Sequence, residues 1–245
     1  MLTMMTTQDP GTSGTRSIAE SLGGGLQEGS LVIIEGGPHT GKSVLCRHIT
    51  SGILDSHGTP VAYYSHEFHS YGLYQRMLAI GLDPSADITA GRFVVFKIYS
   101  RKVVREATKS LELLVNHIGR LPPQFKLVVI DSPSIYISRV SPIFKTDFLQ
   151  ACKEMCANGR TIIISIESHA FESKSLLRAY AMSDYYLKLK SQDSVLEGGK
   201  LDARVIKVLE VTKLAGAERW GEESMQFEIK PGIGIQILPI RRVKI

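Results

Sequence analysis

Eight consecutive residues carry the side chains in this chain best suited to phosphate chemistry. They read Gly36-Gly37-Pro38-His39-Thr40-Gly41-Lys42-Ser43 and match the pattern G-x-x-x-x-G-K-[ST] at every position. The largely apolar residues 31–35 precede the pattern, and apolar residues recur at near-helical spacing from Val44 onward. A strand, a glycine-rich turn and a helix N-terminus in this order present backbone N–H groups to phosphate oxygens. The segment therefore predicts a nucleoside triphosphate site.

Individual positions of this phosphate loop have distinct expected roles. Lys42 would reach the β- and γ-phosphates, and the Ser43 hydroxyl would be a ligand of Mg²⁺. The glycines let the backbone approach the phosphates closely, so the expected binding residues run from Gly36 through Val44. A chance glycine-rich turn is the alternative, and it does not account for the strand and helix patterns on either side.

A carboxylate that could complete the site ends another apolar run. Residues 127–130 read Leu-Val-Val-Ile, and Asp131 follows them directly. An acid at the end of such a strand can hold Mg²⁺ against the phosphate charge, directly or through water. A helix N-cap is the structural alternative. Given the phosphate loop, we favour the metal role for Asp131.

Alternating strands and helices are expected to position these groups. The segments with strand patterns, mostly apolar and rich in β-branched residues, are 31–35, 61–64, 92–99, 126–131 and 161–166. Helical patterns separate them, including an amphipathic helix with apolar residues from Val103 to Ile118. Later segments alternate as antiparallel strands do, at 204–212, 224–229 and 233–238. The prediction is an α/β fold with a mainly parallel sheet, helices on both faces and antiparallel C-terminal strands.

Composition indicates one domain in a reducing compartment. Residues 1–16 are rich in Thr, Gly and Ser without periodicity and are predicted to be a flexible tail, whereas 17–245 form a single domain. The tail is too polar for a secretory signal, and no apolar run approaches the roughly 20 residues of a membrane span. Three cysteines suit a cytoplasmic protein. The net charge of +5 is modest, and aromatic residues are not interleaved with basic ones, so nucleic acid is not the expected partner.

Several segments resemble the KaiC-like domains of the RecA superfamily. The resemblance covers residues 17–240 and includes Leu22-Gly23-Gly24-Gly25-Leu26 and Gly29-Ser30-Leu31 before the phosphate loop. Within that group, Tyr63-Tyr64-Ser65, Ile130-Asp131-Ser132 and the ending at 232–239 are most similar to the FlaH (ArlH) family. Members of that family are ATP-binding accessory proteins of the archaellum, the archaeal flagellum.

The resemblance implies a RecA-like core that binds ATP with Mg²⁺. It also implies a homo-oligomeric ring, often a hexamer, with ATP near the subunit interfaces. The implied place is the cytoplasm at the base of the archaellum. There the implied partners are the motor ATPase FlaI and the scaffold FlaX, beneath the membrane protein FlaJ. ATP binding would regulate assembly, while FlaI supplies the power.

Glu67 is the candidate for the carboxylate that orients the attacking water. In RecA-type proteins this carboxylate ends the strand beside the phosphate-loop strand, and we expect segment 61–64 to be that strand. A general base must lie within hydrogen-bond reach of its water. A solvated loop acid is the alternative reading of Glu67.

Two departures from active KaiC proteins predict slow hydrolysis. Active relatives carry two adjacent acids after the second strand, where this chain has His66-Glu67. They also carry a Lys-x-Arg that reaches the phosphates of the neighbouring subunit, where this chain has Lys213-Leu214-Ala215. Lys213 could still bind in trans, but an arginine finger is worth on the order of 10³–10⁵ in rate. We therefore expect a nucleotide-dependent switch with at most slow ATPase activity.

Three other functions fit parts of the sequence. An active KaiC/RecA-type ATPase in DNA repair or signalling would use Glu67 and Lys213 together with the basic C-terminus. An interaction module with a vestigial site is a second possibility, but it gives no reason to keep Lys42, Ser43 and Asp131 together. A small-molecule kinase is the third, and it usually needs an arginine-rich lid, which the middle of the chain does not show.

Overall fold

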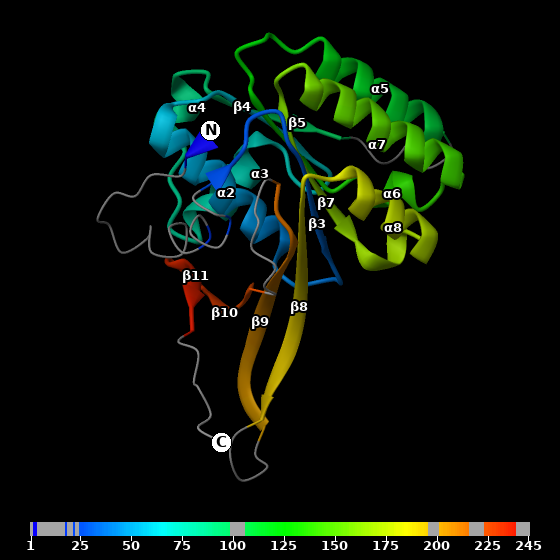
Figure 1. Ribbon diagram of the computed structural model, residues 1–245. Coiled ribbons are helices and arrows are strands. Elements are labelled where there is room, and N and C mark those ends of the chain that lie inside the picture. Colours follow the sequence, from blue (N-terminus) through cyan, green and yellow to red (C-terminus); the bar gives the residue numbers. More distant parts are fainter. Residues whose placement is uncertain are drawn as a thin grey trace.

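The computed structural model describes residues 2–3, 18, 22, 25–98, 106–195, 201–215 and 223–238. Its main feature is a nine-stranded sheet with helices on both faces (Figure 1). The strands are ordered β11-β10-β9-β8-β3-β7-β6-β4-β5 across the sheet. The segment that carries the phosphate loop therefore starts from the middle of the sheet.

The parallel part of the sheet has apolar, buried inner strands and partly exposed outer strands. Its members are β3 (Leu31–Gly36), β4 (Val61–Ser65), β5 (Phe93–Lys97), β6 (Leu127–Asp131), β7 (Thr161–Glu167) and β8 (Tyr185–Val195). β3 pairs in parallel with β7 on one side and with β8 on the other. The five strands predicted for this part are confirmed. Because all of these strands run in one direction, their carboxyl ends share one edge of the sheet.

The predicted position of β4 is wrong. β4 pairs with β5 and β6, so β7 and β6 separate it from β3. Apolar patterns identify buried strands but not their order, because any of several buried strands could fill the place beside β3. Ser65 at the end of β4 is instead the register partner of Asp131. Glu67 consequently approaches the site from beyond Asp131 rather than from beside β3.

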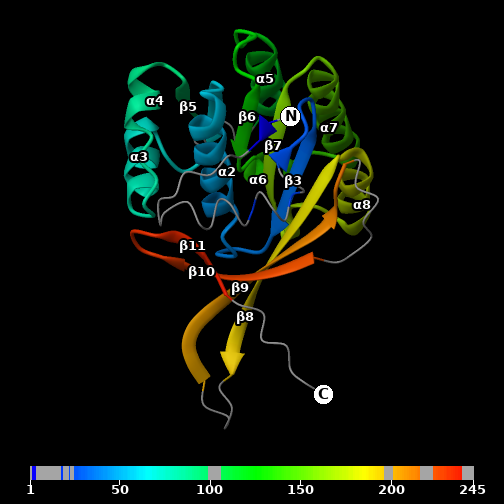
Figure 2. The same ribbon diagram turned by 60° about the vertical axis from the view of Figure 1, so that its left-hand side comes forward.

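Strand β8 has no counterpart in the sequence prediction. It joins the two parts of the sheet, since it is parallel to β3 and antiparallel to β9 (Leu201–Lys213). Lys188 and Lys190 alternate with the buried Leu187 and Leu189 along it, which is the period of a strand. Together β8 and β9 form a long ribbon that extends away from the helices (Figures 1 and 2).

The helices divide between the two faces of the sheet. On one face lie α2 (Lys42–His57), α3 (Ser70–Leu78) and α4 (Ser85–Thr89), and on the other lie α5 (Ala107–Gly119), α6 (Ser134–Ile137), α7 (Pro142–Ala157) and α8 (Ser173–Met182) (Figure 2). Each group covers its own apolar cluster. The expected layers of helix, sheet and helix are therefore confirmed. Val103 and Val104, which the sequence places on the amphipathic helix, lie outside the described residues.

The C-terminal strands extend the sheet in antiparallel fashion, as the sequence predicts. β10 (Glu223–Lys230) pairs with β9, and β11 (Gly234–Ile237) pairs with β10. At the other end of the chain, β1 (Leu2–Thr3) pairs with β2 (Gly25–Leu26), and the rest of segment 1–16 lies outside the described residues. Within the described ranges, no helix is long and apolar enough to span a membrane.

Candidate nucleotide-binding site

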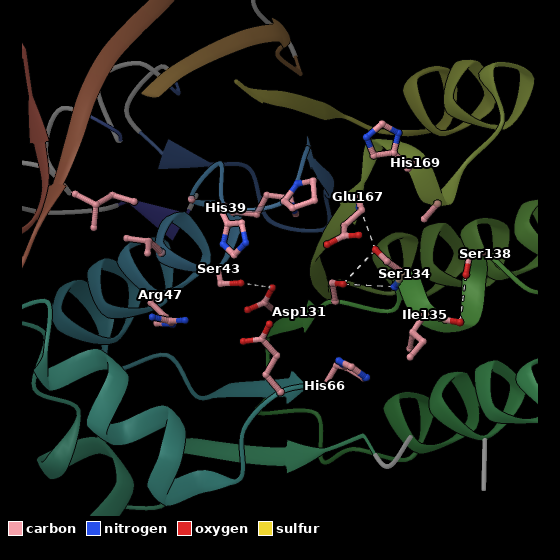
Figure 3. Close-up of a pocket in the computed structure, with 18 residues that line it drawn as sticks. His39, Ser43, Arg47, His66, Asp131, Ser134, Ile135, Ser138, Glu167 and His169 are labelled. Atoms are coloured by element: carbon pink, nitrogen blue, oxygen red, sulfur yellow. Dashed lines mark hydrogen bonds between the residues drawn. The ribbon is translucent and has the colours of Figure 1, made fainter. Parts of the chain in front are cut away.

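A cavity of about 730 Å³ opens at the edge where the parallel strands end (Figure 3). One wall is the phosphate loop with the start of α2. The opposite walls come from the ends of β4, β6 and β7, which contribute Glu67, Asp131 and Glu167. In open α/β sheets, ligands bind in the crevice outside the carboxyl ends of the strands. The cavity therefore lies where this fold can hold a ligand.

Local backbone geometry shapes the phosphate loop. His39 and Gly41 have φ values of 59° and 102°, in the left-handed region, and helix α2 begins directly after Gly41. The Thr40 hydroxyl donates to the Gly37 carbonyl at 2.9 Å and fastens the turn. A Cβ atom at Gly36 would lie 2.5 Å from Thr40 Oγ1 and 2.8 Å from the Leu189 carbonyl oxygen. Only glycine fits at position 36 without moving the loop or β8.

Lys42 lies under the loop with its ammonium group held by backbone oxygens. Its Nζ donates to the carbonyls of Gly37 and Gly36 at 2.7 and 3.0 Å. Burial lowers the pKa of this ammonium group, and the carboxylates of Glu167 and Asp131 oppose that shift. The charge is thus kept at the floor of the cavity, where a phosphate could replace the carbonyl contacts.

Asp131 is the centre of a hydroxyl network. Its Oδ1 accepts from Ser43 Oγ at 3.0 Å and from Ser165 Oγ at 2.7 Å, and its Oδ2 accepts from the Tyr63 hydroxyl at 2.7 Å. Burial raises the pKa of Tyr63 well above its usual value, and the nearby Asp131 charge adds to that shift. The network links α2, β4, β6 and β7, so the carboxylate is fixed from three sides.

The oxygens of Ser43 and Asp131 fit a magnesium ion. Hydroxyl and carboxylate oxygens are the hard ligands that Mg²⁺ prefers, and these two already lie within 3.0 Å of each other. The described residues contain no group of three or more His, Cys, Asp or Glu side chains that could bind a metal by itself. Phosphate and water oxygens would have to supply the remaining ligands.

Glu67 lines the cavity from the loop that follows β4. The loop is tied to Asp131, because the His66 N–H donates to the Asp131 carbonyl at 3.0 Å. Lys97 Nζ in turn donates to the His66 carbonyl at 2.5 Å. Glu67 itself is exposed. The structure therefore brings Glu67 to the edge of the cavity, and its water-orienting role stays a prediction.

Lys213 lies away from the cavity. Its Nζ donates to the Tyr180 and Ala181 carbonyls, at 3.0 and 3.1 Å, at the C-terminal end of α8. It lines a different hollow together with Ala215 and the Lys153–Asp184 ion pair. Lys213 does not reach the phosphate loop of its own chain, so its predicted role in trans stays a prediction.

Among the lining residues that were not identified from the sequence are Glu167 and Arg47. Glu167 ends β7, where it is the register partner of Gly36, and its side chain points into the cavity (Figure 3). The sequence pattern that would have identified Glu167 was present. This acid directly follows the apolar run at 161–166, just as Asp131 directly follows the apolar run at 127–130. Arg47 lies on α2 one turn after Ser43, and helical spacing alone could have placed it beside the site.

The C-terminal strands support the phosphate loop from outside. Lys207 on β9 donates from Nζ to the His39 carbonyl at 2.6 Å. Ile229 on β10 lines the cavity and lies against Gly41, where an added Cβ would be 3.1 Å from Ile229 Cδ1. The antiparallel extension is therefore part of the site and not a separate appendage.

Comparison with known families identifies the group to which the chain belongs. The family model described as the ATPase KaiC matches residues 11–242. The chain is a member of the KaiC family. The mixed α/β architecture with its antiparallel C-terminal strands agrees with this membership, and the predicted RecA-type fold is confirmed.

Individual relatives of this KaiC-family chain include proteins of two kinds. The archaeal flagellar ATP-binding protein FlaH of Sulfolobus acidocaldarius is 25% identical over 222 residues, which cover 89% of this chain and 92% of that protein. The DNA repair and recombination protein RadB of Thermococcus gammatolerans is 37% identical over 123 residues, 49% of this chain and 50% of that protein. The similarity to FlaH expected from the sequence is confirmed.

A solved structure shows the same fold along almost the whole chain. The flagellar accessory protein FlaH of Methanocaldococcus jannaschii superimposes with a TM-score of 0.78 and 20% identity, over 98% of this chain and 100% of that one. This likeness establishes the fold. What the KaiC-family site of this chain binds has to be argued from its own residues.

Proposed function

We propose that this chain is an ATP-binding component of the archaellum, in which Mg²⁺-ATP controls assembly and hydrolysis is slow. One observation carries the proposal. Lys42, Ser43 and Asp131 surround a single cavity at an intact phosphate loop, in a KaiC-family chain that is similar to FlaH over most of its length. The fold provides the phosphate site, and the similarity to FlaH indicates the cellular setting.

Nucleotide binding would use groups that the chain already orients. Backbone N–H groups at the N-terminus of α2 would face the phosphates, and Lys42 would exchange its carbonyl contacts for phosphate oxygens. Ser43 and Asp131 would hold Mg²⁺, which neutralises part of the phosphate charge when bound. Ser165 and Tyr63 keep the Asp131 carboxylate in place for that task.

Slow hydrolysis follows from the groups that would have to activate the water. In hydrolysis, water attacks the terminal phosphorus and the products are ADP and phosphate. Glu67 would orient that water from an exposed loop, and His66 stands where active relatives carry a second acid. Ala215 stands at the expected position of the arginine finger, and without that cation the rate falls by about 10³–10⁵.

The assembly that we propose is a homo-oligomeric ring. Its partners would be those that the resemblance to FlaH implies, which are FlaI, FlaX and, through them, the membrane protein FlaJ. Lys213 would act across the subunit interface, after giving up its contacts with the end of α8. The place of action would be the cytoplasmic face of the membrane. This part of the proposal is supported by the similarity to FlaH and by the position of Lys213 outside its own cavity.

The test combines binding, turnover and molar mass on the full chain. Wild type should bind ATP in the presence of Mg²⁺, and Lys42→Ala should bind at least about tenfold more weakly because a charge-assisted phosphate contact is lost. Light scattering should show a mass that increases with Mg²⁺-ATP in wild type but not in Lys42→Ala. Turnover on the order of 1–10 per second would contradict the switch.

The similarity to RadB supports a second candidate function, an active ATPase in DNA repair. The same turnover assay separates it from the switch when single-stranded or duplex DNA is added. Stimulation by DNA, abolished by Glu67→Gln, would favour the repair enzyme. Slow turnover that DNA does not change would favour the archaellum component.

A further inference from the structure

Arg47 is a buried cation in the wall of the cavity. The residue is 7% exposed, and its Nε atom has no hydrogen-bond partner. It lies one helical turn after Ser43, on the side of α2 that faces Asp131. Long helical side chains lean toward the N-terminus of their helix, which directs Arg47 toward the cavity. Figure 3 shows its guanidinium group on the same side of the cavity as Ser43 and Asp131.

An anion close to this guanidinium group would stabilise the protein, because a buried charge without a partner is costly. Asp131 accepts hydrogen bonds from the hydroxyls of Ser43, Ser165 and Tyr63. Among the ion pairs of the described residues, none includes Arg47. An anion that moves into contact with Arg47 could therefore become its partner.

Glu67 is the carboxylate best placed to become that partner. Ser65 is the register partner of Asp131, and the His66 N–H is bonded to the Asp131 carbonyl, so the chain reaches Glu67 directly beside Asp131. Arg47 lines the same cavity from the α2 side. The neighbouring His66 Nε2 is a second buried nitrogen without a hydrogen-bond partner. The loop that carries Glu67 thus contains a buried nitrogen without a hydrogen-bond partner.

We infer that Arg47 pairs with Glu67 when nucleotide binds, and that this pair holds the carboxylate away from the attacking water. The inference rests on the proposed function, since it explains how the site binds ATP but hydrolyses it slowly. A bidentate guanidinium–carboxylate contact occupies oxygens that a water would otherwise use. Loops beside active sites commonly close on bound ligand, which would bring the exposed Glu67 inward. Arg47 is then a positioning residue that acts through Glu67.

The experiment measures single-turnover ATP hydrolysis, ATP affinity and melting temperature in five full-length proteins. These are wild type, Arg47→Gln, Arg47→Lys, Glu67→Gln and the double variant Arg47→Gln/Glu67→Gln. Freeing Glu67 should make Arg47→Gln about tenfold faster or more, because a positioned base contributes 10²–10⁴-fold. Arg47→Lys keeps the charge but loses the bidentate contact, so its rate should lie between those of wild type and Arg47→Gln. The double variant should lose the gain and turn over no faster than Glu67→Gln alone.

The possible results test the inference and the proposed function separately. An Arg47→Gln rate equal to or below that of wild type, with intact ATP binding, would overturn the inference. A gain that persists in the double variant would do the same. If Arg47→Gln melts too early to assay, Arg47→Lys decides in its place, because a rate no faster than that of wild type would show that the bidentate contact does not restrain Glu67. Failure of wild type to bind ATP would instead reject the proposed function.

Discussion

The backbone N–H of Ile235 donates a 3.0 Å hydrogen bond to His48 Nε2, which joins the phosphate-loop helix α2 to the last strand of the sheet. The approach is close because Gly234 has no side chain; a Cβ there would lie 2.3 Å from His48 Nε2. An Nε2 atom that accepts a hydrogen bond carries no proton. The fold therefore depends on a neutral imidazole at position 48.

This contact predicts a loss of stability in acid. Burial, aided by the nearby Arg47 charge, lowers the pKa of His48 to about 4, whereas an unfolded histidine has a pKa of about 6.5. Below pH 6.5 the unfolded chain therefore binds a proton at His48 that the native state does not bind until the pH is near 4. Stability is complete above that pH and falls as the pH drops toward 4. The loss amounts to about 3 kcal/mol over this window.

Urea unfolding of wild type and His48→Gln at several pH values measures this loss. Glutamine can accept the Ile235 hydrogen bond and does not titrate, so the other acidic groups cancel in the difference. The stability of wild type relative to His48→Gln should fall by about 3 kcal/mol from pH 7.5 to pH 4. A difference that does not vary with pH would contradict a neutral, buried His48.

Two adjacent tyrosines allow a matched test of the Asp131 network. Tyr63 donates to Asp131 Oδ2 on one face of the sheet, whereas the Tyr64 hydroxyl contacts His117 Nδ1 at 2.7 Å on the other. Tyr63→Phe leaves a buried carboxylate oxygen without its donor and should reduce the free energy of unfolding by about 2 kcal/mol. Tyr64→Phe should cost about 1 kcal/mol. Only Tyr63→Phe should weaken Mg²⁺-ATP binding in a titration; an equal effect of both would reject a role for the network in binding.

Local patterns in the sequence predicted much of the fold and part of the candidate site. The phosphate loop and the end of β6 could be read because their residues are contiguous and their strands are buried on both faces. Strand β8 was overlooked because its lysines interrupt the apolar run, although Lys188 and Lys190 keep the period of a strand. The order of the parallel strands could not be read, since it depends on how each helix crosses the sheet. Glu167 and Arg47 were overlooked although each carried a local signal, an acid that ends an apolar run and a position one helical turn after Ser43.

Neighbouring glycines of the phosphate loop should differ sharply in their tolerance of alanine. A Cβ at Gly36 would lie within 2.8 Å of the rigid Leu189 carbonyl, whereas one at Gly37 would meet only Thr40 Cγ2 at 3.8 Å. Gly36→Ala must shift β8 or the loop and should reduce the free energy of unfolding by about 1–3 kcal/mol, with loss of ATP binding. Gly37→Ala should change stability by less than about 0.5 kcal/mol. Chemical denaturation and nucleotide titration of the pair measure both effects, and equal tolerance would contradict the packing of β8 against the loop.

Glu167 should weaken nucleotide binding when no metal is present. Its carboxylate faces the cavity and is the strongest of the acidic groups that act on Lys42, so it competes with phosphate for that ammonium group and also repels the triphosphate. Glu167→Gln removes both effects at nearly constant volume. In EDTA, its dissociation constant for ATP should be about threefold to tenfold lower than that of wild type, a gain of about 1 kcal/mol.

The control for Glu167→Gln is a charge change of the same size elsewhere on the surface. Glu210 pairs with Lys190 at 2.6 Å on the β8–β9 ribbon and does not line the cavity, so Glu210→Gln reports the effect of net charge alone. Isothermal titration of both variants with ATP, with and without Mg²⁺, separates the local from the global effect. Because Mg²⁺ screens the phosphates, the gain from Glu167→Gln should shrink when the metal is added. Weaker binding by Glu167→Gln in Mg²⁺ would mean that this carboxylate helps to hold the metal, and would reject simple repulsion.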